Sequence, residues 1–152
     1  MSLDYRSYDE AKEKFNWSER WTLFDGKKDN FNIAHECIDR HPQHDTAVRI
    51  KFDDRRTETY TFGHFSEYTC RFANYLESLG VNFGDRIAIL LFPSIELYVS
   101  MFGTFRKGAV AVMLSPLFGP EAIYFRLSKS EAKAIVTTKG MKSLLIPNLL
   151  PN

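Results

Sequence analysis

The sequence predicts an α/β fold in which a partial parallel sheet is flanked by helices. Residues 87–92 and 109–114 are continuous apolar runs, and residues 134–137 form a shorter one, as is typical of buried strands. A helix-like segment precedes the first run and two more separate the runs, and Gly80 and Gly108 end the first two of these three segments. Strands that alternate with helices favour parallel pairing with right-handed crossovers.

Residues 1–46 are predicted to form an aromatic arm followed by a short helix. Residues 5–31 are polar with spaced aromatic side chains and no sustained period, so we expect the rings to pack against a larger body. Asn32 is a candidate N-cap for a helix that runs to Arg40. The inner face of that helix is predicted to hold Ile33, Cys37 and Ile38.

Residues 47–152 are predicted to form an incomplete α/β subdomain that begins with a β-hairpin. Residues 47–52 alternate in polarity, and residues 58–61 return after a polar turn. Thr61 is a candidate N-cap for the long helix that follows. Its apolar stripe, at three-and-four spacing, is predicted to be Phe65, Tyr68, Phe72, Tyr75, Leu76 and Leu79.

The next two helices have clear start signals. Ser94 is a candidate cap for the first helix, whose predicted buried side is Ile95, Tyr98, Phe102 and Phe105. Pro120 suits the first position of the second helix, which Ile123 and Leu127 should anchor.

The C-terminal residues 141–152 are apolar but contain two prolines, which argue against one continuous helix. We expect either a helical turn and loop that cover the sheet or a segment that packs on chain beyond Asn152.

Charge and composition exclude several classes of partner. The 152 residues include 20 basic and 19 acidic side chains, so a net charge of +1 provides no electrostatic case for nucleic acid or an anionic membrane. No apolar run approaches the ~20 residues that span a bilayer, and the N-terminus lacks a signal-peptide layout. Cys37 and Cys70 do not make a disulfide framework, which predicts a reducing cytoplasm.

Several sequence blocks, taken in order and with their spacing, resemble one enzyme family. These blocks are residues 59–62, 71–76, 84–89, 105–110 and 118–123. Together they resemble the N-terminal part of the AMP-forming acyl-CoA synthetases, including acetyl-CoA synthetase-like members, within the adenylate-forming superfamily. The resemblance implies that residues 47–152 are part of the N-terminal subdomain of that fold.

The resemblance implies an activity for a larger parent enzyme. Such enzymes use ATP and Mg to attach AMP to a small carboxylic or fatty acid, which releases pyrophosphate and creates a good leaving group. The thiol of coenzyme A then forms the acyl-CoA thioester. The family's phosphate loop, Mg-binding acid, ribose-binding Asp and C-terminal lysine are not found in these 152 residues. We therefore expect the chain to hold no catalytic residue and not to adenylate by itself.

Two residues are candidate contacts for coenzyme A, again by resemblance. Gly119 follows the aromatic Phe118, and in acetyl-CoA synthetase-like relatives a glycine after this aromatic residue lies against coenzyme A. This chain has one glycine here, whereas acetyl-CoA synthetases have two. Without a Cβ, its backbone can be approached closely. Lys142 falls near the position of an arginine for the coenzyme's phosphate, whereas Leu145 stands where a second basic residue is expected. The alternative for Lys142 is a solvated surface lysine.

Other motifs favour structural roles. Residues 137–140 superficially resemble a phosphate loop but lack its glycines, so a strand-to-helix turn is predicted. Residues 84–86 predict a tight turn before a central strand. Four potential zinc ligands lie close together in the sequence: His35, Cys37, His41 and His44. Zinc needs four ligands that converge on it, and the spacing of these residues does not favour convergence, so no metal site is predicted.

Three hypotheses follow for the function. The first is an N-terminal fragment of an acyl-CoA synthetase that serves as scaffold. The second is a non-catalytic interaction or ligand-binding module derived from such an enzyme. The third, an unrelated flavodoxin-like domain, is disfavoured because no strand end carries a phosphate loop. An incomplete sheet leaves unpaired edges and apolar surface, so the isolated chain is also expected to self-associate.

Overall fold

The computed structural model describes residues 5–145, and the chain divides into two compact units, residues 1–32 and 33–152. The first unit contains α1 (Tyr8–Lys14) and the 3₁₀ helix η1 (Trp17–Leu23). The Ser7 hydroxyl caps α1 by accepting from the Glu10 N–H, and Lys14 pairs with Glu10 at 2.8 Å. No residue of α1 is buried. Local caps and ion pairs form this helix, which explains why no apolar period predicted it.

The aromatic side chains of the first unit pack on one another. The Phe31 ring lies 5.1 Å from Phe24 and 5.9 Å from Trp21, both edge to face. Phe15 and Trp17 make a second edge-to-face pair at 5.2 Å. Edge-to-face pairs of this kind stabilise a fold beyond the contribution from burial of the rings. Packing of these rings against a larger body stays a prediction.

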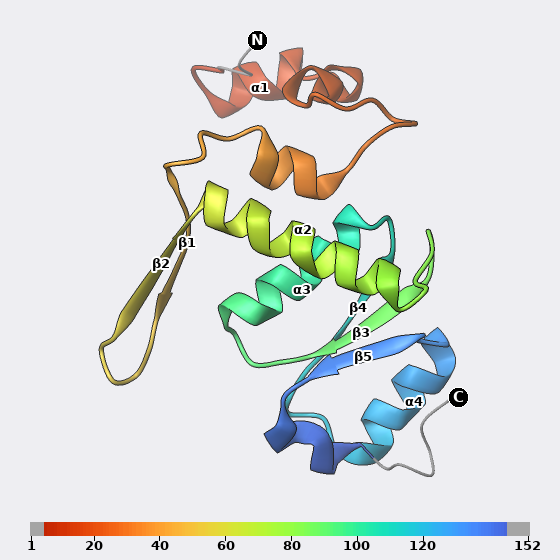
Figure 1. The fold of residues 1–152 in the computed structure, drawn as a ribbon. Helices are drawn as coiled ribbons and strands as arrows, with labels where there is room; N and C mark the ends of the chain where they lie inside the picture. The colour runs from red at the N-terminus through yellow and green to blue at the C-terminus, as the bar shows by residue number, and fades with distance from the viewer. Residues whose placement is uncertain (1–4, 146–152) are drawn as a thin grey trace. The chain divides into compact units, whose positions relative to one another are not determined.

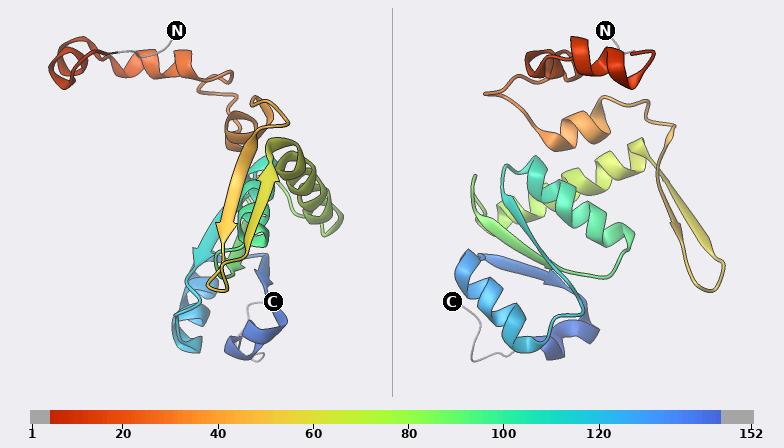
Figure 2. Two further views of the ribbon diagram at one scale, coloured as in Figure 1. Left: turned by 90° about the vertical axis from the view of Figure 1, so that its left-hand side faces the viewer. Right: turned by 180° about the vertical axis from the view of Figure 1, so that it is seen from behind.

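The second unit has three layers, as the sequence predicts (Figures 1 and 2). The central sheet has the strand order β4-β3-β5 and is parallel throughout. Helices α2 and α3 cover one face, and α4 covers the other. A hairpin of β1 and β2 precedes these layers and is antiparallel. The strands are β1 (Thr46–Lys51), β2 (Thr57–Thr61), β3 (Arg86–Leu90), β4 (Val110–Leu114) and β5 (Ala134–Thr137). The helices are α2 (Phe62–Ser78), α3 (Ile95–Arg106) and α4 (Pro120–Ser130).

The core lies on both faces of the central strand β3. Ile87 and Ile89 face α2 and α3, whereas Ala88 and Leu90 face α4, and all four are fully buried. The 3₁₀ helix η3 (Lys139–Leu144) completes the α4 face, because Met141 and Leu145 pack into the same cluster. The alternation explains the continuous apolar run, since helices cover each side of the strand.

The prediction that residues 109–114 form a second fully buried strand is wrong for β4. Val110 is 48% exposed and Met113 is 45% exposed. The physical reason is position, because β4 is an edge strand and β3 is the central one. An apolar run alone does not distinguish the two places in a sheet.

The predicted inner faces of α2 and α3 also need correction. Tyr75 and Leu79 of the predicted α2 stripe are 58% and 51% exposed. In α3, the predicted Ile95, Tyr98 and Phe102 are only half-buried and pack against a separate cluster around Ile38. The two helices approach each other through small side chains, which hydropathy patterns do not single out. The buried small residues are Thr69, Ala73, Ser100, Gly103 and Thr104.

The short helix after residue 32 is a π-helix, η2 (His35–Asp39), with the Arg40 N–H donating to the His35 carbonyl at 3.2 Å. Its predicted inner face is wrong at two positions, because Cys37 is exposed and Ile33 is 41% exposed. Ala34 and Ile38 are fully buried instead. The wider turn of a π-helix shifts which side chains share a face.

The caps of α2 and α3 agree with the sequence, whereas the predicted N-cap Asn32 does not begin η2, whose N-cap is Ala34 without a side-chain cap bond. The Thr61 hydroxyl accepts from the His64 N–H, and the Ser94 hydroxyl accepts from the Leu97 N–H. Gly80 adopts a φ of 76° after α2, where a residue with a Cβ would be strained. Residues 146–152 of the predicted C-terminal tail lie outside the described residues.

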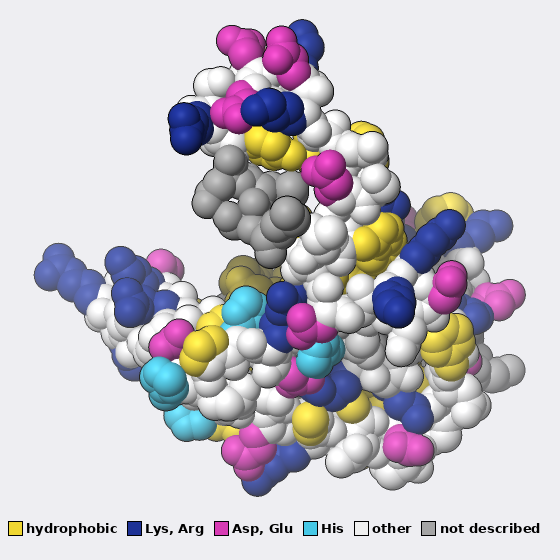
Figure 3. Space-filling model, turned by 90° about the horizontal axis from the view of Figure 1, so that it is seen from above, with side chains coloured by type: hydrophobic (Ala, Val, Ile, Leu, Met, Phe, Trp, Pro, Cys, Tyr) yellow, Lys and Arg dark blue, Asp and Glu magenta, His cyan; other side chains and the backbone are white. Residues whose placement is uncertain are grey.

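Basic and acidic side chains are interspersed over the face seen in Figure 3, as the balanced composition predicts. Within residues 5–145, no helix combines the length and the apolar character needed to cross a membrane.

Candidate functional site

The carboxyl ends of β3 and β5 meet at one edge of the sheet, where Leu90 pairs with Thr137. From there the chain passes through residues 91–94 into α3 and through Thr138 into η3. In open α/β sheets, ligands bind in the crevice outside the carboxyl ends of parallel strands. This edge is therefore the first place to look for a site.

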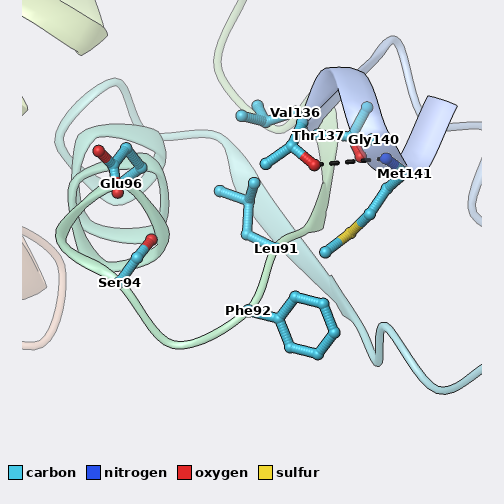
Figure 4. Close-up of a pocket in the computed structure, with 9 residues that line it drawn as sticks. Leu91, Phe92, Ser94, Glu96, Val136, Thr137, Gly140 and Met141 are labelled. Carbon is cyan, nitrogen blue, oxygen red and sulfur yellow. Dashed lines mark hydrogen bonds between the residues drawn. The ribbon is translucent and has the colours of Figure 1, made fainter. Parts of the chain in front are cut away.

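A pocket of about 700 Å³ opens at this edge (Figure 4). Figure 4 shows three segments around a common space: the residues that follow β3, the first turn of α3, and the end of β5 with the start of η3. A pocket of this size is typical of small-molecule sites. The lining residues are Leu91, Phe92, Ser94, Glu96, Val136, Thr137, Thr138, Gly140 and Met141.

Two helix caps position the pocket walls. The Ser94 hydroxyl accepts from the Leu97 N–H at 3.4 Å, which turns the chain away from the sheet. The Thr138 hydroxyl accepts from the Met141 N–H at 3.4 Å. Glu96 lies in the first turn of α3, where the helix dipole favours a carboxylate. The polar residues that begin the two helices thus shape the site.

The polar groups of the pocket are few. Glu96 forms no ion pair with any residue in the range 5–145. The Thr137 hydroxyl oxygen is buried and has no hydrogen-bond partner in the described part of the chain. Burial of a hydroxyl without a hydrogen-bond partner costs free energy. We therefore expect another interaction, such as a hydrogen bond to a ligand, to offset this cost. The arrangement suits binding of a largely apolar group with a few polar contacts.

The two predicted coenzyme contacts, Gly119 and Lys142, do not line the pocket. Gly119 is the exposed N-cap of α4, with a φ of −70°, and a Cβ built on it would meet no atom within 4 Å. Lys142 is exposed on η3. Their chain neighbours Phe118 and Met141 both belong to the apolar cluster on the α4 side of the sheet. No requirement of the fold explains the glycine.

The structure places a basic side chain, Arg126, next to Phe118, although no sequence pattern singled it out as a site residue. The Arg126 guanidinium lies 4.1 Å from the centroid of the Phe118 ring, adjacent to Gly119. Sequence reasoning expected a second basic residue at Leu145, which instead is buried against the sheet. Arg126 also donates to the Ala122 carbonyl at 2.9 Å, one turn earlier in α4.

Sequence analysis also missed the walls that follow β3. Phe92, Ser94 and Glu96 were not predicted as site residues, although they directly follow a strand that reads as fully buried. Their place after a central parallel strand is the signal that could have found them.

The turn at residues 84–86 has the predicted structural role. Asp85 accepts from the Asn82 N–H at 2.7 Å and from Lys133 at 2.9 Å. These hydrogen bonds, the backbone one first, lower the pKa of the Asp85 carboxyl. Arg86 donates to the Ser130 carbonyl at 2.8 Å, which ties β3 to the end of α4.

The four residues that invite a metal hypothesis lie in different surroundings. His41 stacks on the Phe62 ring at 4.7 Å, and the His44 side chain is 86% exposed. Cys37 is exposed on η2, where His35 begins the helix. Among residues 5–145, no group of three or more His, Cys, Asp or Glu side chains is placed to hold a metal ion.

Comparison with known proteins adds three findings. A family model described as AMP-binding enzyme matches residues 34–152. The acetyl-coenzyme A synthetase of Bacillus subtilis (strain 168) is 34% identical over 152 residues, which covers 97% of this chain and 27% of that protein. That of Laribacter hongkongensis (strain HLHK9) is 31% identical, covering 90% of this chain and 23% of the relative.

Solved structures agree with these relatives. The crystal structure of Brucella canis acyl-CoA synthetase matches with a TM-score of 0.89 and 32% identity, over 95% of this chain and 27% of that one. An anthranilate CoA ligase, solved in complex with anthranoyl-AMP, matches with a TM-score of 0.70 and 26% identity over 80% of this chain and 23% of that one. The chain spans about a quarter of the length of these relatives. By the match over residues 34–152, the chain belongs to the AMP-binding enzyme family.

Proposed function

We propose that this chain is the N-terminal scaffold of an AMP-forming acyl-CoA synthetase. The complete enzyme joins a small carboxylic or fatty acid to coenzyme A, with ATP and Mg as the energy source. The observation that carries the proposal is 34% identity to an acetyl-coenzyme A synthetase across 97% of the chain. The pocket at the carboxyl ends of β3 and β5 supports it, because substrate sites of open α/β sheets lie there.

The work of this segment is binding and positioning. Adenylation requires charge neutralisation around phosphates, and coenzyme A supplies the thiol that accepts the acyl group. We assign to this chain one side of the coenzyme site, and we place the adenylation residues in the remainder of the enzyme. The chain alone is then a non-catalytic binding unit.

The surroundings of Gly119 fit a phosphate-bearing ligand. Its exposed backbone begins α4, where the helix dipole favours anions, and open space lies where a Cβ would be. Arg126 lies over the ring of Phe118, the residue before Gly119, and Lys142 directly follows Met141 of the cluster on which Phe118 packs, so both can supply positive charge. We propose that Gly119 and Lys142 contact coenzyme A, with Arg126 as an additional basic contact.

Coenzyme A binding tests this assignment directly. We expect Gly119→Ser to weaken binding by about tenfold, because the added side chain blocks close approach of the ligand to the backbone. Serine is a better N-cap than glycine, so the melting temperature should not fall. Lys142→Met is expected to weaken binding about threefold, as for one exposed charge. NMR titration of coenzyme A into the chain measures each dissociation constant.

Lys139→Met is the matched control, because Lys139 is an exposed lysine at the other end of η3. It should bind coenzyme A as the unchanged chain does. Absence of coenzyme binding to the unchanged chain, or equal binding by Gly119→Ser and Lys142→Met, would overturn the assignment.

Activity of the isolated chain separates the scaffold from an enzyme. With ATP, Mg and acetate, the chain is expected to release no pyrophosphate above a protein-free blank, because its own residues serve binding and positioning. A coupled pyrophosphate assay measures this, with an intact acetyl-CoA synthetase as the positive control. Pyrophosphate release by the purified chain would show that it contains adenylation residues.

The isolated chain is also proposed to self-associate. Both outer strands of the described sheet, β4 and β5, are edges, and Val110 and Met113 on β4 are nearly half exposed. Sedimentation velocity over a range of concentrations measures the association, and a monomer throughout would refute it. A reducing cytoplasm, which suits the free Cys37 and Cys70, and a domain boundary after residue 46 stay predictions.

A further inference from the structure

A second pocket, of about 510 Å³, lies between the hairpin and the helices α2 and α3. Its walls are the rings of Tyr60, Tyr68 and Phe72 together with aliphatic side chains of α3 and β5. It shares Glu96 and Val136 with the pocket at the strand ends, but it faces the hairpin. The coenzyme contacts proposed above do not line it.

The aromatic wall is held in place by hydrogen bonds. The Tyr60 hydroxyl donates to Glu58 at 2.7 Å, and its ring meets Tyr68 edge to face at 6.4 Å. Arg56 donates to the other oxygen of Glu58 at 2.6 Å, so that carboxylate already has a cation. The hydrogen bond to Glu58, with burial and the charges of Glu58 and Glu96, raises the pKa of Tyr60 to about 12. Tyr60 therefore presents a neutral ring to the pocket.

Two polar groups of the pocket lack partners. Glu96 makes no ion pair with residues 5–145, yet its charge acts on the Tyr60 hydroxyl. Ser100 is only 3% exposed, and its hydroxyl forms no hydrogen bond with the residues that the structure describes. The Ser100 hydroxyl oxygen is not among the fully buried atoms without a partner, so it is open to the pocket that it lines, where a ligand can bond to it.

These groups select a ligand by charge. A lone carboxylate repels anions, and the faces of aromatic rings attract cations. An apolar wall of this size would hold an aromatic or alkyl group. The Glu96 carboxylate is exposed to solvent, so a neutral ligand of the same shape gains no charge attraction from it and should bind more weakly than a cation.

We propose that this pocket binds an organic ammonium ion with an apolar body. The ammonium lies between the Glu96 carboxylate and the tyrosine rings, and it donates a hydrogen bond to the Ser100 hydroxyl. The apolar body packs against Phe72 and the aliphatic wall. The proposal is independent of the acyl-CoA synthetase assignment, whose phosphate and carboxylate ligands carry the opposite charge.

Three probes that share a phenyl ring test the charge preference: phenethylammonium, 2-phenylethanol and 3-phenylpropionate. NMR titration of the chain measures the three dissociation constants and shows whether Tyr60 and Tyr68 ring signals move. We expect the ammonium to bind about tenfold more tightly than the alcohol, the effect of one charge-assisted hydrogen bond. The carboxylate should bind more weakly than the alcohol. Equal binding of all three, or no shift of the tyrosine signals, would overturn the proposal.

Matched variants locate the effect. Glu96→Gln should weaken ammonium binding about threefold, as for one exposed charge, and leave the alcohol unchanged. Ser100→Ala should also weaken ammonium binding about threefold. Glu121→Gln is the control, because Glu121 occupies the corresponding position in the first turn of α4, away from this pocket. If Glu96→Gln keeps the ammonium preference, or if Glu121→Gln abolishes it, the site is not the one proposed. Melting curves check that each variant remains folded.

Discussion

Replacement of Asp39 by alanine is expected to lower the free energy of unfolding by about 2–3 kcal/mol. Asp39 accepts from both terminal nitrogens of Arg106, at 2.7 and 2.8 Å, and from the Ser66 hydroxyl at 2.7 Å. One carboxylate thus joins η2 to α2 and α3. The side chains of Asp39 and Arg106 are 26% and 19% exposed, so the effect should lie between that of a surface pair and that of a fully buried one.

Urea unfolding measures this loss, and a double-mutant cycle with Arg106→Met assigns it to the pair. The double variant should be more stable than the sum of the single effects predicts, because removal of both charges leaves neither one without its partner. Asp53→Ala, at an exposed position of the hairpin turn, is the control and should change stability by less than about 0.5 kcal/mol. Equal unfolding midpoints for Asp39→Ala and Asp53→Ala would contradict the prediction.

The same carboxylate makes stability depend on pH. Burial raises the pKa of Asp39, but hydrogen bonds from Arg106 and Ser66 outweigh burial and hold it below its usual range. The stabilisation is therefore present above the unfolded pKa of about 3.9, and it is lost as the pH falls through the lower folded value. Between pH 5 and pH 2, the unchanged chain should lose more stability than Asp39→Asn, which cannot titrate.

Gly103→Leu is the second variant with a large expected effect, a loss of about 2 kcal/mol in the free energy of unfolding. A Cβ at Gly103 would lie 2.7 Å from Cδ1 of Phe72 and 3.0 Å from the Thr69 carbonyl oxygen. The ring can move, but the carbonyl belongs to the backbone of α2. Leucine gains up to about 1 kcal/mol of helix propensity over glycine, which offsets part of the cost of overpacking.

Urea unfolding of Gly103→Leu measures the closeness of α2 to α3. Asn74→Leu provides the control, because Asn74 lies on the exposed side of α2 and has room for the larger side chain. Gly103→Ala should fall between the unchanged chain and Gly103→Leu, since alanine brings only the Cβ. If Gly103→Leu unfolds at the same urea concentration as Asn74→Leu, the helices are not tightly packed at this point.

Elements with strong local signals were predictable. The alternation of β3, β4 and β5 with helices follows from apolar runs, and the helices begin at Thr61, Ser94 and Gly119-Pro120, as side-chain capping and proline preferences predict. The pairing of β3 with β4 and β5 confirms the predicted parallel sheet. Helix α1 was missed because local caps, rather than an apolar face, define it.

The candidate site was only partly accessible to the sequence. Gly119 and Lys142 came from resemblance, whereas Arg126 and Glu96 became visible once α4 and α3 were placed around the sheet. Tyr60 and Glu96 both line the second pocket, although their residue numbers differ by 36. No local pattern predicts such a pair, because it depends on how the hairpin meets the helices.

The sequence by itself determined the fold class, the helix starts and the family resemblance, because these depend on apolar period, capping side chains and the order of short blocks. Tertiary structure alone decided which strand is central, which face of each helix is buried and which side chains share a pocket. β3 and β4 have similar apolar sequences, yet within residues 5–145 only β3 has a strand on both sides. Thr69, Ser100 and Gly103 are buried because two helices meet there, and the interior of that contact accepts small side chains whatever their hydropathy.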